Sequence, residues 1–166
     1  MIWGMTTSTF TLVHALLSLI GIGSGLVVMF GLLTGKPLDG WTVVFLATTV
    51  ATSVTGFGFP IAHLLPSHKV GLISLVVLAV AIIARYAFRL RGAWRRIYVV
   101  GAAMALYLNV FVGVVQAFEK VPALSGMAPK QTDPPFVITQ LVVLALFIVL
   151  TIAAARRFRN SPIHAA

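Results

Sequence analysis

Three histidines are the residues of this 166-residue chain best suited to bind a cofactor: His14, His63 and His68. Neutral imidazole is a common ligand of transition metals and of haem iron. His14 lies about one turn inside a long apolar run, where an ionisable residue is a functional candidate. We therefore expect a b-type haem or metal site built from His14 and His63, with His68 as a further candidate ligand. The competing interpretations are that His63 and His68 are solvated loop residues, and that His14 bonds lipid headgroups or water.

Polar side chains also follow one face of the apolar run at 97–118. Asn109, Gly113 and Gln116 recur at helical spacing, which places Asn109 and Gln116 on the same side of a helix. Intramembrane amides commonly hold helices together, at about 0.6 kcal/mol each, and they can also line a polar pathway. We favour helix packing and keep a pathway for a solute as the alternative.

Small residues predict where two of the expected helices pack together. Gly21 and Gly25 have the GxxxG spacing that lets two helix backbones approach closely. Thr52 and Gly56 lie on a stripe of small and hydroxyl residues in the next apolar run. Packing these two faces together would place His14 near the Gly- and Pro-rich end of that second run.

These residues must be positioned by helices that cross a membrane. The chain is 60% hydrophobic and only 9% charged, whereas soluble domains keep about a quarter of their residues charged. The apolar residues form long blocks rather than a two-residue alternation, which indicates α-helices and not an outer-membrane barrel. We predict an all-α integral membrane bundle of five transmembrane helices, forming a single membrane domain over 1–166. The expected spans are about 10–33, 41–60, 70–88, 97–118 and 136–155.

The positive residues behind the net charge of +9 are placed in a way that predicts orientation. Every arginine lies in the 85–96 segment or near the C-terminus, and these two regions fall on the same side of a five-span bundle. The positive-inside bias then places the N-terminus outside and the C-terminus in the cytoplasm. Basic residues beside spans indicate contact with the lipid bilayer, and with anionic lipid headgroups at the arginine-rich cytoplasmic turn, rather than binding of nucleic acid.

No pattern in the sequence assigns a reaction. The chain has no cysteine, which excludes disulfides, thiolate metal sites and cysteine-based catalysis. No Walker A loop, Rossmann fingerprint or GxSxG motif is present. Asp39, Glu119 and Asp133 lie at the ends of spans or in loops, which argues against a proton-coupled carrier with a buried acid. We name no catalytic residue and expect that the protein is not an enzyme.

Two stretches, LLSLIGIGSGLVVMFGLLTGKPLDGW and TTVATSVTGFGFP, resemble an uncharacterised family of small polytopic inner-membrane proteins of proteobacteria. The resemblance implies a multi-pass protein of the bacterial inner (cytoplasmic) membrane, and it implies no activity. Three functional hypotheses therefore stand. The first is a redox-associated or ligand-binding protein with an outer-leaflet histidine site, and the second is a small-molecule transporter or channel. The third is a non-catalytic accessory subunit that docks on a larger membrane complex or on a second copy of itself.

Overall fold

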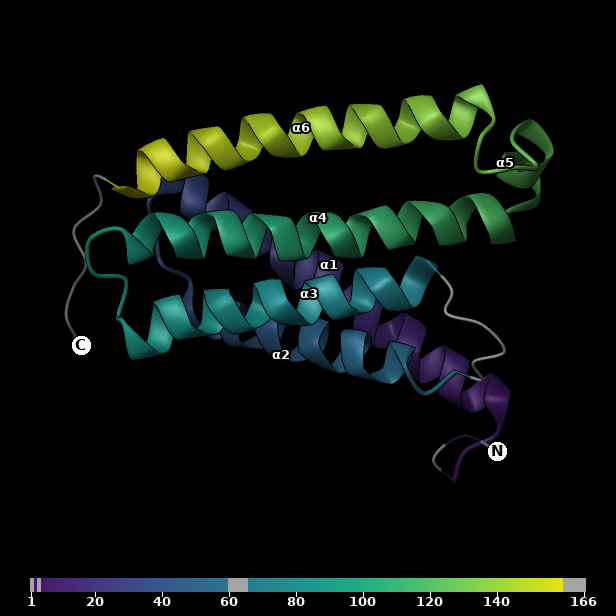
Figure 1. Cartoon of the computed structure of the whole chain (residues 1–166), viewed down its shortest axis with the longest axis horizontal. Coiled ribbons are helices and arrows are strands. Elements are labelled where there is room, and N and C mark those ends of the chain that lie inside the picture. Colours follow the sequence, from purple (N-terminus) through teal and green to yellow (C-terminus); the bar gives the residue numbers. More distant parts are fainter. Residues whose placement is uncertain (1, 3, 60–65, 160–166) are drawn as a thin grey trace.

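The computed structural model describes residues 2, 4–59 and 66–159. Over these residues the chain is helical apart from its connecting turns (Figure 1). The elements are α1 (Thr7–Thr34), α2 (Asp39–Gly56), α3 (Pro66–Ile82), the π-helical turn η1 (Ile83–Ala87), α4 (Trp94–Lys120), the short α5 (Pro122–Met127) and α6 (Pro134–Arg159). The all-α fold class is thus confirmed for the described part of the chain.

Four helical segments are long and apolar enough to cross a membrane: α1, His68–Ala87 of α3 and η1, α4, and Pro134–Phe158 of α6. They contain 20 to 28 residues, and about 20 residues at 1.5 Å each cross a hydrocarbon core of about 30 Å. The chain therefore has the helices of a multi-pass membrane protein. α2 covers most of the predicted span 41–60, but it has only 18 residues and does not belong to this group. The count of five spans stays a prediction.

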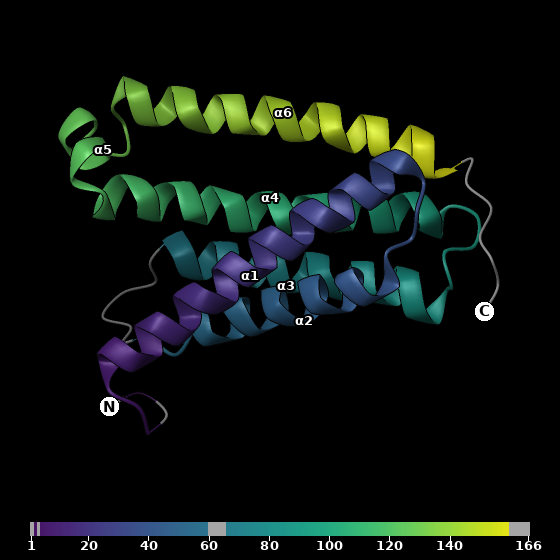
Figure 2. The same cartoon turned by 180° about the vertical axis from the view of Figure 1, so that it is seen from behind.

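The helices form one bundle with two different ends (Figures 1 and 2). α3, α4 and α6 lie side by side, while α1 crosses at an angle and packs against α2, α4 and α6. The N-terminus, the last turn of α2 and α5 lie at one end, which we call the amino end. The turn at 88–93 and the last turn of α6 lie at the opposite end, which we call the arginine-rich end. The two arginine-containing regions thus share one end of the bundle.

The close approach of α1 to its neighbours depends on two glycines. A Cβ atom at Gly25 would lie 2.5 Å from Leu106 Cδ1 and 2.8 Å from the Phe45 ring. A Cβ atom at Gly21 would lie 2.8 Å from Asn109 Nδ2. α1 therefore crosses α2 and α4 at positions where it carries no side chain, as expected for helices that associate through small residues in a membrane.

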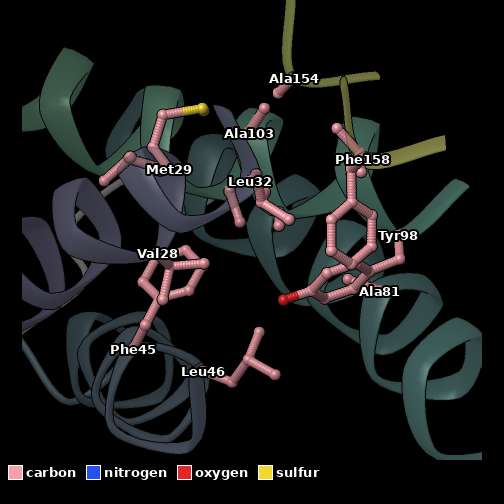
Figure 3. Packing of buried hydrophobic residues seen from close by; sticks show 14 of the residues in the cluster. Val28, Met29, Leu32, Phe45, Leu46, Ala81, Tyr98, Ala103, Ala154 and Phe158 are labelled. Atoms are coloured by element: carbon pink, nitrogen blue, oxygen red, sulfur yellow. The ribbon is translucent and has the colours of Figure 1, made fainter. Parts of the chain in front are cut away.

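An apolar core occupies the bundle between these crossings and the arginine-rich end (Figure 3). Helices α1, α2, α4 and α6 all contribute to it, with side chains that include Val28, Met29, Leu32, Phe45, Leu46, Tyr98, Ala103 and Phe158. Tyr98 and Phe158 have almost no exposed surface, and their ring centres are 6.4 Å apart. This core holds α1, α2 and α4 at fixed positions and packs the bundle tightly on that side.

The arginine-rich segment 85–96 is only partly a turn, because helix continues from both sides into it. Arg85 lies in η1, where it is buried, forms an ion pair with Asp39 and has its guanidinium carbon 5.1 Å from the centre of the Tyr98 ring. α4 already begins at Trp94. A buried arginine is tolerated here because an acidic partner and an aromatic face replace the water that it loses.

Candidate functional site

A polar cavity of about 80 Å³ lies between α1, α2, α3 and α4. The cavity lies beside the last turn of α2 and the first turn of α3. It is therefore closer to the amino end of the bundle than the apolar core is. Half of its lining residues are polar: His14, Thr52, Ser53, His68, Ser74 and Asn109. We call it the histidine cavity, since its two imidazoles come from different helices.

His68 enters the cavity from the first turn of α3. Its side chain is only 5% exposed, and neither Nδ1 nor Nε2 has a hydrogen-bond partner among the described residues. The Phe57 ring covers it at a distance of 5.8 Å between ring centres. Phe57 also lies beside Gly71, where a Cβ atom would be 3.4 Å from the ring, an ordinary van der Waals contact. A buried imidazole with two unpaired nitrogens is costly, so both nitrogens are open to a hydrogen-bonding group from outside the described residues.

His14 reaches the cavity from α1 and is held by α2. Its Nδ1 lies 2.8 Å from Thr55 Oγ1. The Thr55 hydroxyl already donates its one proton to its own helix, at 2.7 Å from the carbonyl of Ala51. The His14 Nδ1–H must therefore be the donor and the threonine oxygen the acceptor. This assigns the neutral ring its tautomer and leaves the lone pair of Nε2 available to a ligand.

Asn109 is placed at the cavity by the middle of α4. Its side chain is 8% exposed, and Nδ2 has no hydrogen-bond partner in the described part of the chain. The absence of a side chain at Gly21 leaves the space that this amide fills. Thr52 Oγ1 also lacks a partner. On the facing wall, Ser53 donates to Ser74 at 3.2 Å, which links α2 to α3 beside the cavity.

The structure brings together several of the residues that the sequence singled out from separate patterns. His14, His68, Thr52, Gly56 and Asn109 all line the histidine cavity. The sequence placed His14 near the end of the second apolar run and offered His68 as a further ligand beside His63, but it treated Asn109 as part of a helix-packing stripe. The arrival of Asn109 at the same cavity was not predicted, because it depends on how far each helix is rotated about its axis.

Other predicted residues lie elsewhere. Gln116 is exposed, and its Nε2 lies 3.5 Å from Glu119 Oε2, so it is separated from the cavity that Asn109 lines. Gly21 and Gly25 are at the helix crossings described above. His63 lies outside the described residues, so its pairing with His14 stays a prediction.

Ser53 and Ser74 were missed at the sequence level. Ser74 had a usable signal, since it is an isolated hydroxyl within the otherwise aliphatic run 70–82. Ser53 had none, because it is one of many small residues in α2.

The size and chemistry of the cavity limit what it can bind. Organic ligands of drug size need sites of about 300–1,000 Å³, so a cavity of about 80 Å³ does not fit a haem. No group of three or more His, Cys, Asp or Glu side chains suited to a metal ion exists within the described residues. The unpaired atoms of the wall include both an amide donor and imidazole nitrogens, so it can donate and accept hydrogen bonds.

Toward the arginine-rich end, apolar packing lies beyond the cavity in the described part of the chain. On that side Gly25 is packed against Leu106 and Phe45, and the apolar core follows (Figure 3). The cavity lies closer to the amino end than to the arginine-rich end.

Comparison with known proteins adds no assignment to this geometry. No protein-family model, no curated protein and no solved structure matches the chain. The histidine cavity and the helices around it are thus the features that bear on function.

Proposed function

We propose that the protein is a membrane-embedded binding protein that takes a small, uncharged, hydrogen-bonding solute into the histidine cavity. The observation that carries the proposal is a set of four buried polar atoms around one cavity that have no hydrogen-bond partner among the described residues. They are Thr52 Oγ1, His68 Nδ1, His68 Nε2 and Asn109 Nδ2. Each such atom costs about 1–3 kcal/mol. A ligand that both donates and accepts hydrogen bonds would recover much of that cost.

The charge of the cavity favours an uncharged ligand. No carboxylate of the described residues lines the cavity, and a cation moved from water into a membrane protein loses several kcal/mol of hydration unless an anion compensates it. The volume favours a very small ligand. One water occupies about 30 Å³ in the liquid, so about 80 Å³ corresponds to roughly two or three waters. Acetamide is a suitable probe, since it is compact, uncharged, and carries both donors and an acceptor.

The topology that completes this proposal has α2 as a short fifth span, in the inner membrane of a bacterium. The N-terminus lies outside and the arginine-rich end in the cytoplasm, which is supported by the grouping of the arginines at that end. Because the chain has no native cysteine, single-cysteine variants can test it. With a membrane-impermeant maleimide, we expect Ser8→Cys to react in intact cells and Arg91→Cys to react only after lysis. The reverse pattern would overturn the orientation.

Solute binding can be tested by thermal unfolding of the purified protein in detergent. A ligand that binds only the folded state raises the unfolding temperature with a saturable dependence on concentration. We expect acetamide to do so for the unchanged protein and not for Asn109→Leu. Gln140→Leu is the matched control, because Gln140 is also buried but bonds the Phe111 carbonyl outside the cavity. An equal response of both variants would contradict the proposal.

A second candidate function is binding of a transition metal ion. It is favoured by one observation: the free lone pair of His14 Nε2 and the unpaired nitrogens of His68 belong to the same cavity. Two imidazoles with water can hold a copper, nickel or zinc ion. Elemental analysis and titration with Zn²⁺ test it. This candidate requires stoichiometric metal that is lost in His14→Ala and in His68→Ala, whereas a metal-free protein indifferent to Zn²⁺ would eliminate it.

A further inference from the structure

A second cavity lies on the outside of the bundle, along the seam between α3 and α4. It is an apolar groove of about 420 Å³ that is lined by apolar residues and, at one end, by Arg96. We call it the α3–α4 groove. The residues used below are Val76 and Val80 of α3 and Arg96, Val100, Gly101 and Met104 of α4.

The groove exists because small residues meet at its floor while larger apolar residues stand at its rims. A Cβ atom at Gly101 would lie 3.1 Å from Ala81 Cβ, so the two helix backbones are close there. At the rims, Val76, Val100 and Met104 are 59%, 46% and 44% exposed. In a membrane protein these exposed apolar side chains face hydrocarbon, so the groove is open to lipid.

One end of the groove is positively charged. Arg96 lines the groove at the arginine-rich end, and its exposed side chain has no hydrogen-bond or ion-pair partner among the described residues. Asp39 is the acidic residue near this end, and it is already paired with Arg85. The Arg96 guanidinium is therefore available to an anion from outside the described chain.

The adjacent turn adds to this positive field. Arg89 and Leu90 adopt left-handed φ angles of 48° and 56°, which residues with side chains rarely adopt. Leu90 is buried and anchors the turn, whereas Arg89 and Arg91 are exposed. Anionic headgroups are attracted to such juxtamembrane clusters of basic residues.

We propose that the α3–α4 groove binds one acyl chain of an anionic phospholipid, with the lipid phosphate at Arg96. The distances agree with this assignment. Arg96 and Met104 are eight residues apart, or about 12 Å along α4, which lies within the single leaflet of about 15 Å that one chain crosses. A second copy of the protein fits less well, because a symmetric contact would bring two Arg96 side chains to the same depth.

Native mass spectrometry of the purified protein, supplied with defined lipids, tests the proposal. The probes are phosphatidylglycerol, phosphatidylethanolamine with the same acyl chains, and glycerol 3-phosphate, which carries the phosphate without a chain. We expect one tightly retained phosphatidylglycerol per chain, weaker retention of phosphatidylethanolamine, and no competition by glycerol 3-phosphate.

Variants locate the site. Arg96→Gln should lower phosphatidylglycerol affinity about fivefold, the loss expected for one basic residue near a membrane surface. Met104→Trp should fill the groove and abolish tight retention. The matched controls are Arg156→Gln, another exposed arginine at the same end, and Ile148→Trp, a lipid-facing position on α6 that is 51% exposed. Both controls should retain the lipid.

Three results would overturn the proposal. Equal retention of the two phospholipids, or equal losses in the variants and their controls, would show unspecific surrounding lipid. Full competition by glycerol 3-phosphate would assign the anion site to a soluble phosphate compound. A dimer that Met104→Trp dissociates would show that the groove is a contact between two copies. Each variant is compared at matched helix content, so that loss of fold is not read as loss of binding.

Discussion

Replacement of Asn109 by leucine tests whether the buried amide serves ligand binding or the stability of the fold. Leucine branches at Cγ as asparagine does, although it is larger, and it removes the buried Nδ2, which has no partner in the described residues. Asn109 is only 8% exposed, so its Nδ2 donor bears nearly the full free-energy cost of desolvation. Relief of that cost should stabilise the folded protein by about 1–3 kcal/mol.

The expected gain has no large packing penalty set against it. The Asn109 amide fills the space that Gly21 leaves open, and the adjoining cavity of about 80 Å³ has room for the larger leucine side chain. The neighbouring Thr49 Oγ1 loses nothing, because it is not hydrogen-bonded to the amide. Asn109→Leu should therefore be more stable than the unchanged protein and unable to respond to acetamide.

The assay is equilibrium unfolding in mixed detergent micelles, followed by helix content as the denaturing detergent is increased. Gln140→Leu is again the control, because it removes one unpaired acceptor, Oε1, but also breaks the bond to the Phe111 carbonyl. We expect its stability to change little or to fall. If Asn109→Leu is destabilised by more than about 1 kcal/mol, the amide is a structural element and our reasoning about the cavity is wrong.

Two further predictions concern the scaffold. Gly25→Ala should lower the free energy of unfolding by about 1–3 kcal/mol, because the added methyl meets Leu106 at 2.5 Å. Gly23→Ala on the same helix meets nothing within 4 Å and should be neutral or slightly stabilising. Equal losses in the two variants, measured by the same unfolding assay, would contradict the helix crossing. Asp39→Asn should destabilise the folded protein by about 1–3 kcal/mol, because it leaves the buried Arg85 without its anion. The loss is smaller than for a fully buried ion pair, since Asp39 is 77% exposed. An unchanged unfolding midpoint would refute this prediction.

The helices could be predicted from the sequence because the thickness of a bilayer fixes the length of an apolar run. The predicted span 10–33 corresponds to α1 at Thr7–Thr34, and 97–118 corresponds to α4 at Trp94–Lys120. The ends differ by one to three residues because helices continue into polar flanks through caps, such as the Thr6 hydroxyl at the start of α1. Such caps do not alter the hydrophobic pattern.

The composition of the site could be predicted only in part. The sequence named His14 and His68 as candidates for one cofactor site, together with His63, but it assigned Asn109 to a separate helix-packing stripe. Asn109 and Gln116 share a helix face by periodicity, yet seven residues separate them by about 10 Å along the axis. That distance places one amide in a buried cavity and the other at an exposed helix end. The rotation and depth of each helix follow from tertiary packing, for which a single sequence carries little signal.

The most direct test of the central claim is a nuclear magnetic resonance titration of the isotope-labelled protein with acetamide. It observes the side-chain NH₂ of Asn109 and the ring of His68. We predict saturable shifts of both signals with one common dissociation constant, while the side-chain NH₂ of Gln140 does not move. Signals of Asn109 and His68 that stay unchanged, or that drift linearly in parallel with Gln140, would contradict a solute site in the histidine cavity.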